Sequence, residues 1–307
     1  MRWGAARQRG VALVTAMIVA FVAVAAATDL TTRQQLDIRR TETLIRTMEG
    51  RSVVEDIERV AVVAVASDRK AGIRGYSEPR EIEWPGGAGG QDPAAHLEDQ
   101  QRLFNLNALA ADGAAGQTAG ERFRNLLGQL GLDAGLANAV VDWVDDDGIR
   151  REPGGAEDDV YARKPQPYRA ANHPFARVEE LRLVHGVSED VYRVLAPYVA
   201  ALPVEAGINV NVADPVVLRS LDPEMSAAAA SRIVERRSVE PFAGAAEFLA
   251  MPELADLSIP LDGLTTESRY FRLSARVSRG GHETRVSTDF ESSDLVYRIL
   301  LRWPEES

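Results

Sequence analysis

The chain has 307 residues, a formal net charge of −11 at pH 7 and no cysteine. This length is large for one small domain and indicates about two. The negative charge makes nucleic acid an unfavourable partner. Without cysteine, the fold has neither disulfides nor a thiol nucleophile.

The first thirty residues hold the most informative pattern. A basic leader, residues 1–10, ends in glycine, and the uncharged apolar run 11–27 follows directly. The run is longer than most apolar parts of secretory signal peptides, about 7–15 residues, and shorter than the roughly 20 residues of a membrane span. It fits a signal peptide cleaved at Ala25–Ala27, a plain signal anchor, or a leader removed after Gly10.

Three features favour removal of the leader after Gly10. The glycine separates basic from apolar residues, and the polar Thr15 interrupts the apolar segment one turn later. The segment also continues into an amphipathic helical pattern over residues 30–70. A continuous helix over residues 11–67 would be about 85 Å long, with residues 11–28 in the membrane and the remainder packed on a globular domain.

The sequences RQRG, VALVTAMIVAF and RQQLDIRRTETL resemble the N-terminus of a type IV pilin-like protein. The chain resembles in particular the minor pseudopilin K family of the type II secretion system (general secretion pathway protein K). Most pilins have glutamate at the fifth mature position, and K-type pseudopilins lack it, as this chain does at Thr15. Because a carboxylate in the bilayer is costly unless paired, that glutamate is thought to meet the terminal amine of a neighbouring subunit.

The resemblance implies that prepilin peptidase cuts after Gly10 and methylates Val11. It implies a single-pass protein of the bacterial inner membrane with its C-terminal domain in the periplasm. The implied partners are the I-type and J-type minor pseudopilins and the pseudopilus itself. A subunit with Thr15 lacks the attachment to a subunit above it, which suits the tip of a filament.

Residues 72–92 are rich in glycine and proline and predict a surface loop around one short strand at residues 81–84. The glycine run 86–90 lacks the lysine or serine that a phosphate-binding loop requires.

Residues 104–261 have a predominantly helical pattern, and two stretches, 178–198 and 208–251, resemble helix-hairpin-helix units. The second resembles the units of DNA-uptake proteins. Its hairpin, residues 221–225, contains two acids and a proline but no glycine, whereas phosphate binding needs free backbone N–H groups and basic neighbours. We therefore expect an all-helical packing module and no nucleic-acid partner.

An acidic loop lies in the middle of this helical region. Eight carboxylates lie within residues 142–159, and oxygen-rich loops of this kind suit Ca²⁺. Asp145-x-Asp147-Gly148 resembles the start of an EF-hand loop, but the glutamate of that motif is not at its required position. The loop could instead be a solvated acidic loop without a ligand, or it could hold a pair of carboxylates that catalyse hydrolysis.

The resemblance favours calcium, because the acids after Asp142-Trp143 and the sequence GAED match a signature of the K family, whose structures carry calcium in this domain. We expect the metal ligands to be Asp145, Asp147, Glu157 and Asp158. The second choices are Asp142 and Asp159. No two of the four histidines lie at metal-ligand spacing and no serine lies in a nucleophile elbow, so we expect no enzyme.

The C-terminal residues alternate apolar and polar side chains with the period of a strand. Gly280–Gly281 predicts a hairpin turn. Phe271, Leu273, Ala275 and Val277 would form an apolar face, and the soluble part of the N-terminal helix is its natural cover.

These patterns predict an α+β fold. A pilin-like core would consist of the long N-terminal transmembrane helix packed on a small antiparallel sheet, with a large inserted all-helical, helix-hairpin-helix-like domain. The expected divisions are a leader (1–10), a transmembrane part (11–28), the soluble helix and first strand or strands (29–93), the helical insertion (94–263) and the C-terminal strands (264–307).

The function that these expectations favour is that of a structural minor pseudopilin. It would cap the tip of the type II secretion pseudopilus, nucleate its assembly and so support protein export across the outer membrane. The alternatives are a secreted or membrane-anchored acidic calcium-binding enzyme and a helix-hairpin-helix DNA-uptake protein.

Overall fold

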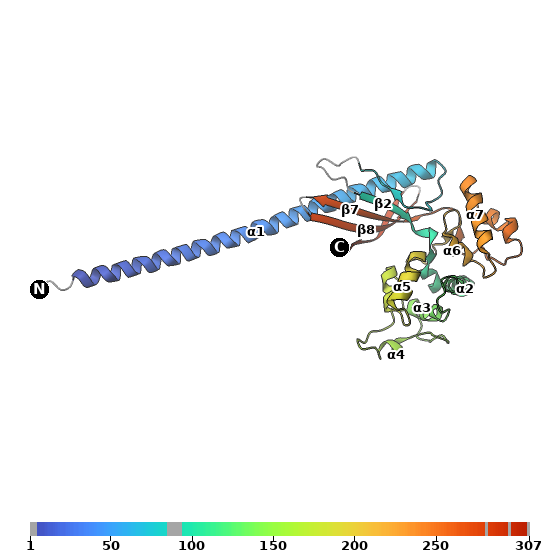
Figure 1. Ribbon diagram of the computed structural model, residues 1–307, viewed down its shortest axis with the longest axis horizontal. Coiled ribbons are helices and arrows are strands. Elements are labelled where there is room, and N and C mark those ends of the chain that lie inside the picture. Colours follow the sequence, from blue (N-terminus) through green and yellow to red (C-terminus); the bar gives the residue numbers. More distant parts are fainter. Residues whose placement is uncertain (1–4, 85–93, 280–281, 294–295, 306–307) are drawn as a thin grey trace. The chain divides into compact units, whose positions relative to one another are not determined.

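The computed structural model describes residues 5–84, 94–279, 282–293 and 296–305 (Figure 1). The glycine run 86–90, the predicted turn at Gly280–Gly281 and the first four leader residues lie outside the described residues. The chain forms two compact units, one of Met1–Asp56 with Val277–Thr284 and the other of Ile57–Arg276 with Arg285–Ser307.

The helices are α1 (Ala5–Lys70), α2 (Gly113–Gln129), α3 (Leu136–Val144), α4 (Asp158–Tyr161), α5 (Glu189–Leu195), α6 (Pro215–Arg219), α7 (Ala227–Val239) and α8 (Ala245–Leu249). The 3₁₀ turns are η1 (Gln100–Arg102), η2 (Leu106–Ala110), η3 (Val178–Leu183), η4 (Ala196–Tyr198) and η5 (Pro252–Leu254). The strands are β1 (Arg80–Glu81), β2 (Ala94–Asp99), β3 (Phe104–Asn105), β4 (Val199–Ala200), β5 (Ile208–Asn209), β6 (Leu264–Thr265), β7 (Tyr270–Arg279), β8 (His282–Ser292) and β9 (Tyr297–Pro304).

In the first unit, the part of α1 that follows the basic leader, residues 13–27, carries uncharged and mainly apolar side chains on all sides. Large apolar side chains such as Leu13, Met17 and Phe21 are exposed, with Phe21 at 75%. Leu13–Thr41 is long and apolar enough to cross a membrane. A helix that is apolar all round is stable in a protein core or in lipid, and none of the apolar window of this segment is buried by the described residues.

Gly50 lies in the middle of α1 and is buried. A glycine within a helix costs about 1 kcal/mol relative to alanine. A Cβ at this position would lie 2.9 Å from Oγ1 of Thr284 on β8. The glycine therefore permits a close approach between the helix and this strand.

In the second unit, the last part of α1 packs against the sheet. Ile57, Ala61 and Val65 are buried on one helix face. On the same part of the helix, Glu58 accepts hydrogen bonds from Thr288 and Arg302. Arg69 donates to the carbonyl oxygens of Ser268 and Ser292. These contacts explain the amphipathic pattern that the sequence shows over this stretch.

The sheet has the strand order β1-β2-β7-β8-β9. The described pairings β1–β2, β2–β7 and β8–β9 are antiparallel. The predicted apolar face is buried at Phe271, Leu273 and Ala275. This face alternates with polar residues, as period-two patterning requires.

Two boundaries of the sheet differ from the sequence prediction. β2 lies within residues 94–263, the range assigned to the insertion, so the insertion begins after Asp99. The strand is short and has only two apolar residues facing inward, Ala95 and Leu97, so its alternation is weak. The strand expected at residues 81–84 is confined to β1, although Ile82 still donates its N–H to the carbonyl of Ala95.

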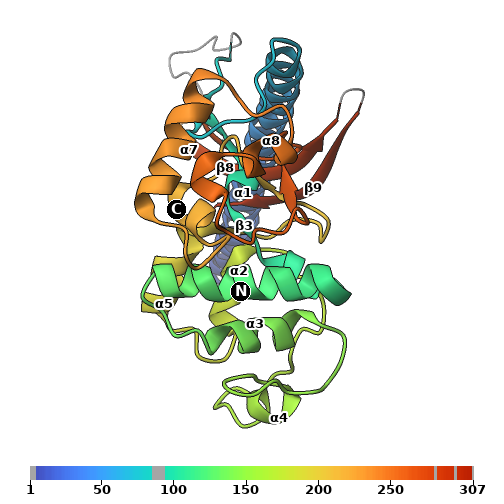
Figure 2. The same cartoon turned by 90° about the vertical axis from the view of Figure 1, so that its right-hand side faces the viewer.

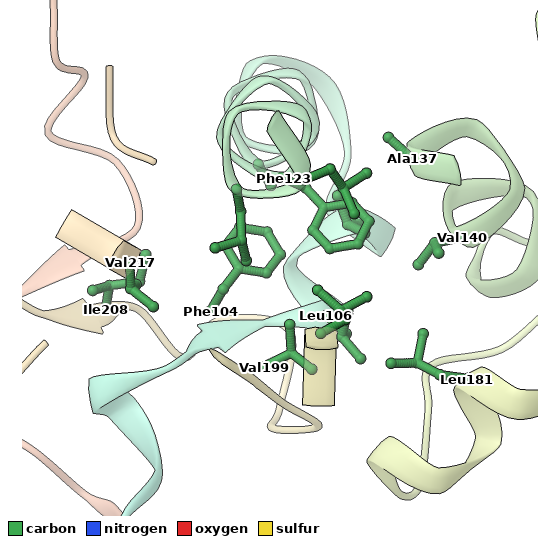
Figure 3. Packing of buried hydrophobic residues seen from close by; sticks show 14 of the residues in the cluster. Phe104, Leu106, Phe123, Ala137, Val140, Leu181, Val199, Ile208 and Val217 are labelled. Carbon is green, nitrogen blue, oxygen red and sulfur yellow. The ribbon is translucent and has the colours of Figure 1, made fainter. Parts of the chain in front are cut away.

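The insertion between β2 and β7 has its own hydrophobic core (Figure 3). Phe104 and Phe123 stack with ring centroids 5.3 Å apart, and Figure 3 shows Leu106, Val140 and Leu181 gathered beside them. Figure 2 shows α2 lying alongside α3.

The insertion is not wholly helical, because two short parallel strand pairs, β3–β4 and β5–β6, lie within it. Asparagine side chains hold these extended segments. Asn105 accepts the N–H of Leu202 and donates to the carbonyl of Pro203. Asn209 donates to the carbonyl of Arg74 and to the Ser268 hydroxyl. These long-range amide contacts leave no periodic signal in the sequence.

The two helix-hairpin-helix-like stretches form short helical pairs. The first consists of η3 and α5, joined through Gly186 at φ +83°. The second consists of α6 and α7, which begin at the capping side chains of Asp214 and Ser226. In its hairpin, the Asp222 carboxylate accepts hydrogen bonds from the backbone N–H groups of Glu224 and Ser258. These N–H groups are therefore not free to bind a phosphate.

Candidate metal centre

The acidic loop starts at the end of α3, where Asp142 is fully buried. Its carboxylate accepts a hydrogen bond from the backbone N–H of Arg151 at 3.1 Å and from the Arg151 guanidinium at 3.0 Å. The same guanidinium also bonds to Asp145. Arg151 therefore closes the loop by satisfying two acids of the preceding helix end, since buried carboxylates need such partners.

Glycine at position 155 is required by this closure. A Cβ at Gly155 would lie 2.3 Å from Oδ2 of Asp142 and 2.2 Å from the carbonyl oxygen of Arg151. Gly155 also donates its N–H to that carbonyl. The chain can thus return close to α3, and it places Glu157 next to the loop's first acids.

Three carboxylates meet at this point. Ligand oxygens of Asp145, Asp147 and Glu157 all lie within 4.8 Å of one another. Asp145 ends α3, and Asp147 accepts the N–H of Ile149 within the loop. Glu157 occupies the position before α4. Among the described residues this is the one group of histidines and acids with such geometry.

The electrostatics of the cluster disfavour three free negative charges. Burial, with the nearby charges of Asp142, Asp145, Asp147 and Asp158 adding to it, raises the pKa of Glu157 to about 7. Burial also raises the pKa of Asp145, although the Arg151 guanidinium opposes this effect. Like charges brought together in this way stay ionised only if a cation compensates them.

Two oxygens of the cluster lack any partner. Oδ1 of Asp145 and Oε1 of Glu157 are buried and receive no hydrogen bond. A buried carboxylate oxygen without a donor costs free energy, whereas Ca²⁺ binds six to eight such oxygens in flexible geometry, at about 2.3–2.6 Å. The donor set therefore fits a hard divalent cation such as calcium. The groove beside Asp145 and Asp147 offers an entry path.

The other acids of the loop have different partners. Asp158, the fourth expected ligand, is not in the cluster, because it starts α4 and accepts the N–H of Ala170 at 3.0 Å. The second choices also lie elsewhere. Asp142 is bound by Arg151, and Asp159 forms an exposed pair with Arg163.

A cluster of aromatic rings lies next to the acids. Trp143 packs edge-on against Tyr161 at 5.2 Å between centroids, and Tyr161 lies 5.2 Å from Tyr168. The Tyr161 hydroxyl accepts the N–H of His185, and Lys164 lies over both tyrosine rings. These contacts connect the acidic loop to the segment between η3 and α5, so Trp143 and Tyr161 are packing residues.

Sequence reasoning did not identify Arg151 as the residue that organises this site. Arg151 lies nine positions after Asp142 in the sequence. That separation matches neither the helical nor the strand repeat, so periodicity does not bring the two residues together. The available signal was the pair Gly154-Gly155, which marks a close return of the backbone.

The predicted processing positions lie far from this cluster in the sequence. Gly10, Val11 and Thr15 are all within α1. Thr15 is exposed and falls inside the apolar segment Leu13–Thr41.

Comparison with protein families gives a consistent result. Two family models, both described as "Type II secretion system (T2SS), protein K", match residues 102–204 and 208–267. The chain is 32% identical to type II secretion system protein K of Pseudomonas aeruginosa, over 96% of this chain and 92% of that protein. It is 29% identical to the protein of the same name from Klebsiella pneumoniae, over 96% of both chains.

A solved structure is similar over most of the chain. It is described as the GspK–GspI–GspJ complex of the type 2 secretion system from enterotoxigenic Escherichia coli. The TM-score is 0.74 at 26% identity, and the match covers 87% of this chain and 100% of the other.

The fold and these similarities define a minor pseudopilin of type II secretion. The chain belongs to the type II secretion system protein K family.

Proposed function

We propose that this chain caps the tip of the pseudopilus and nucleates its assembly together with I-type and J-type minor pseudopilins. The similarity that carries this proposal is the match to a K-type chain from a complex of those three proteins, since the match spans 87% of this chain. In this role the chain acts as a structural subunit and catalyses no reaction.

The N-terminal helix supplies the assembly element. Prepilin peptidase would remove the leader after Gly10 and methylate Val11, which leaves the apolar part of α1 as a single-pass anchor in the inner membrane. The head would then lie in the periplasm. Thr15 offers no carboxylate to a neighbouring terminal amine, so attachment of a further subunit above this one is disfavoured.

The second unit supplies the body of the subunit. The last part of α1 and the five-stranded sheet would form the pilin-like core, and the burial of Ile57, Ala61 and Val65 supports this. The insertion, with its separate core, adds bulk that a filament subunit in the interior would not accommodate.

Calcium would act as a structural ion in the insertion. Asp145, Asp147 and Glu157 would hold it, and its charge would compensate acids that raise one another's pKa. The ion would join the end of α3 to the start of α4 and so fix the loop between them.

Assembly of purified full-length chains in detergent tests the proposal. We expect this chain to form a complex with the I-type and J-type pseudopilins of the same organism, with one copy of this chain per complex by native mass spectrometry. Deletion of the chain should abolish secretion. Absence of a complex, together with normal secretion in the deletion strain, would overturn the proposal.

A further inference from the structure

Two hollows flank α2 and meet at its first turn. The larger, about 730 Å³, lies between α2, the end of α3 and residues 172–174. The smaller, about 460 Å³, lies between α2 and the segments 204–208 and 262–263. Both are lined by Ala110, Ala111, Asp112 and Val204. We call this continuous surface the α2 groove.

A buried glycine of α2 lines the larger hollow. Gly120 lies inside α2, where glycine costs about 1 kcal/mol relative to alanine. A Cβ at this position would meet nothing closer than the Arg124 guanidinium, at 3.8 Å. A larger side chain at this position would therefore extend past the Arg124 guanidinium into the larger hollow.

The groove is negatively charged. Five acids line the larger hollow, against two arginines: Asp112, Glu121, Asp145, Asp146 and Asp147 against Arg124 and Arg151. Arg151 is already bound to Asp142 and Asp145. Within the described part of the chain, Asp112, Glu121 and Asp146 form no ion pair. Three acids and one arginine, Arg124, therefore remain in the larger hollow, an excess of negative charge that favours a cationic ligand.

The smaller hollow is mainly apolar. Its walls include Phe104, Ala108, Ala115, Ala119 and Ile208. The one arginine there, Arg122, is buried and directs its guanidinium to the carbonyl oxygens of Asp262 and Pro260, both at 2.7 Å. Pockets of about 300–1,000 Å³ with apolar walls and few polar groups accept large side chains. This end therefore suits an apolar anchor.

We propose that the α2 groove binds an extended segment of another polypeptide, with lysine or arginine at one end and a large apolar side chain at the other. The cationic end would lie between Glu121 and Asp146, and the main chain would pass Gly120. The apolar end would enter the smaller hollow beyond Asp112. An extended chain fits because a single ligand must span two adjoining hollows, one acidic and one mainly apolar.

This binding does not require the metal centre, because Asp112, Glu121 and Asp146 are not members of the carboxylate cluster. It also goes beyond the tip function. A chain that failed to assemble with other pseudopilins would still bind the segment, so the two proposals fail separately.

Fluorescence polarisation with labelled peptides on the full chain in detergent tests the proposal. The probe has lysines at one end, a Gly-Ser centre, and Leu-Phe at the other end. Two control peptides replace either the lysines with glutamates or Leu-Phe with serines. We expect saturable binding of the probe, at least about tenfold weaker binding of both controls, and weakening with salt.

Matched variants locate the binding site. Gly120→Leu should block the groove and weaken probe binding by at least about tenfold. Gly128→Leu is its control, because Gly128 is on the same helix, has open space around its Cβ, and does not line the groove. Glu121→Lys with Asp146→Lys should have a similar effect, and Glu235→Lys on α7 should have none.

Three outcomes would overturn the proposal. The first is equal binding of the lysine and glutamate peptides. The second is equal loss of binding in Gly120→Leu and Gly128→Leu, with both variants folded by circular dichroism. The third is self-association of the chain that Gly120→Leu abolishes while the probe does not bind, which would assign the groove to a second copy.

Discussion

The N-terminal part of α1 and the acidic loop after α3 depart from the usual arrangement of soluble proteins in opposite ways. The first exposes apolar side chains, such as Phe21 at 75%. The second buries carboxylates, such as Asp142 at 0% and Glu157 at 5% exposure. Each region is unfavourable in water as it stands.

The difference shows which kind of partner each region requires. Exposed apolar surface all round a helix is stabilised by lipid or by neighbouring helices. Buried like charges are stabilised by a cation or by protonation. Under the proposed function, the first region would hold the chain in a membrane, and a cation bound in the second would fix the conformation of the head.

The largest effect should come from a charge placed in the apolar part of α1. Phe21→Arg should add about 3 kcal/mol to the cost of membrane insertion and strongly reduce the membrane-bound fraction, measured by fractionation and immunoblotting. Val63→Arg is the matched control, because Val63 is also an exposed apolar residue of α1, at 68%, outside the candidate span. Equal loss in both variants would remove the distinction between the two parts of the helix.

Calcium should stabilise the head. A ligand that binds only the folded state at a hundredfold excess over its dissociation constant adds about 2.7 kcal/mol. We expect a higher melting temperature of the full chain with Ca²⁺ than with EDTA. Asp145→Ala with Glu157→Ala should abolish the difference, while Asp159→Ala should leave it. Identical melting curves of the unaltered chain in both buffers would contradict the site.

Loss of Arg151 should destabilise the acidic loop even when no calcium is present. Arg151→Met leaves Asp142 without its cation and should lower the free energy of unfolding by about 2 kcal/mol, less than for a fully buried pair because Arg151 is partly exposed. Chemical denaturation in EDTA measures the change. The control is Arg150→Met, which removes exposed pairs with Glu152 and Asp159 and should cost at most about 1 kcal/mol.

The change in stability with pH should be smaller than the effect of Arg151→Met, and it should be gradual. Burial raises the pKa of Glu157 to about 7 and that of Asp99 to about 6. An acid with a raised pKa binds its proton more tightly in the folded state. In EDTA, stability should therefore increase as pH falls from about 8 to about 5, and Glu157→Gln should flatten part of this slope.

Calcium should reverse the contribution of the cluster to this pH dependence, because metal ligands must be deprotonated. The stabilisation by Ca²⁺ should thus grow as pH rises. Stability in EDTA that falls as pH decreases from 8 to 5 would show that the carboxylates have partners of another kind.

The sequence predicted features that depend on local periodicity. Apolar residues at helical spacing indicated the last part of α1, and alternation indicated β7 with Phe271 and Leu273 on its buried face. Asp145, Asp147 and Glu157 were expected as metal ligands because the loop is crowded with carboxylates and resembles the K-family signature, and the structure brings their oxygens within 4.8 Å of one another.

Features that depend on long-range contacts could not be predicted. β2 pairs with β7, about 175 residues further along the chain, and its own short alternation is weak. The parallel pair β3–β4 depends on the Asn105 side chain contacting Leu202. Asp158 was expected to bind the metal because the sequence GAED resembles the K-family signature. The start of α4 instead directs its carboxylate to Ala170, a direction that spacing alone does not give.

The mature N-terminus tests the central claim most directly, because the account requires that the apolar part of α1 remains on the working protein. Intact-mass and N-terminal peptide analysis of the chain from its native membrane should show a start at Val11 with a methylated amine. A mature protein that starts at Thr28 and is free in solution would contradict the account.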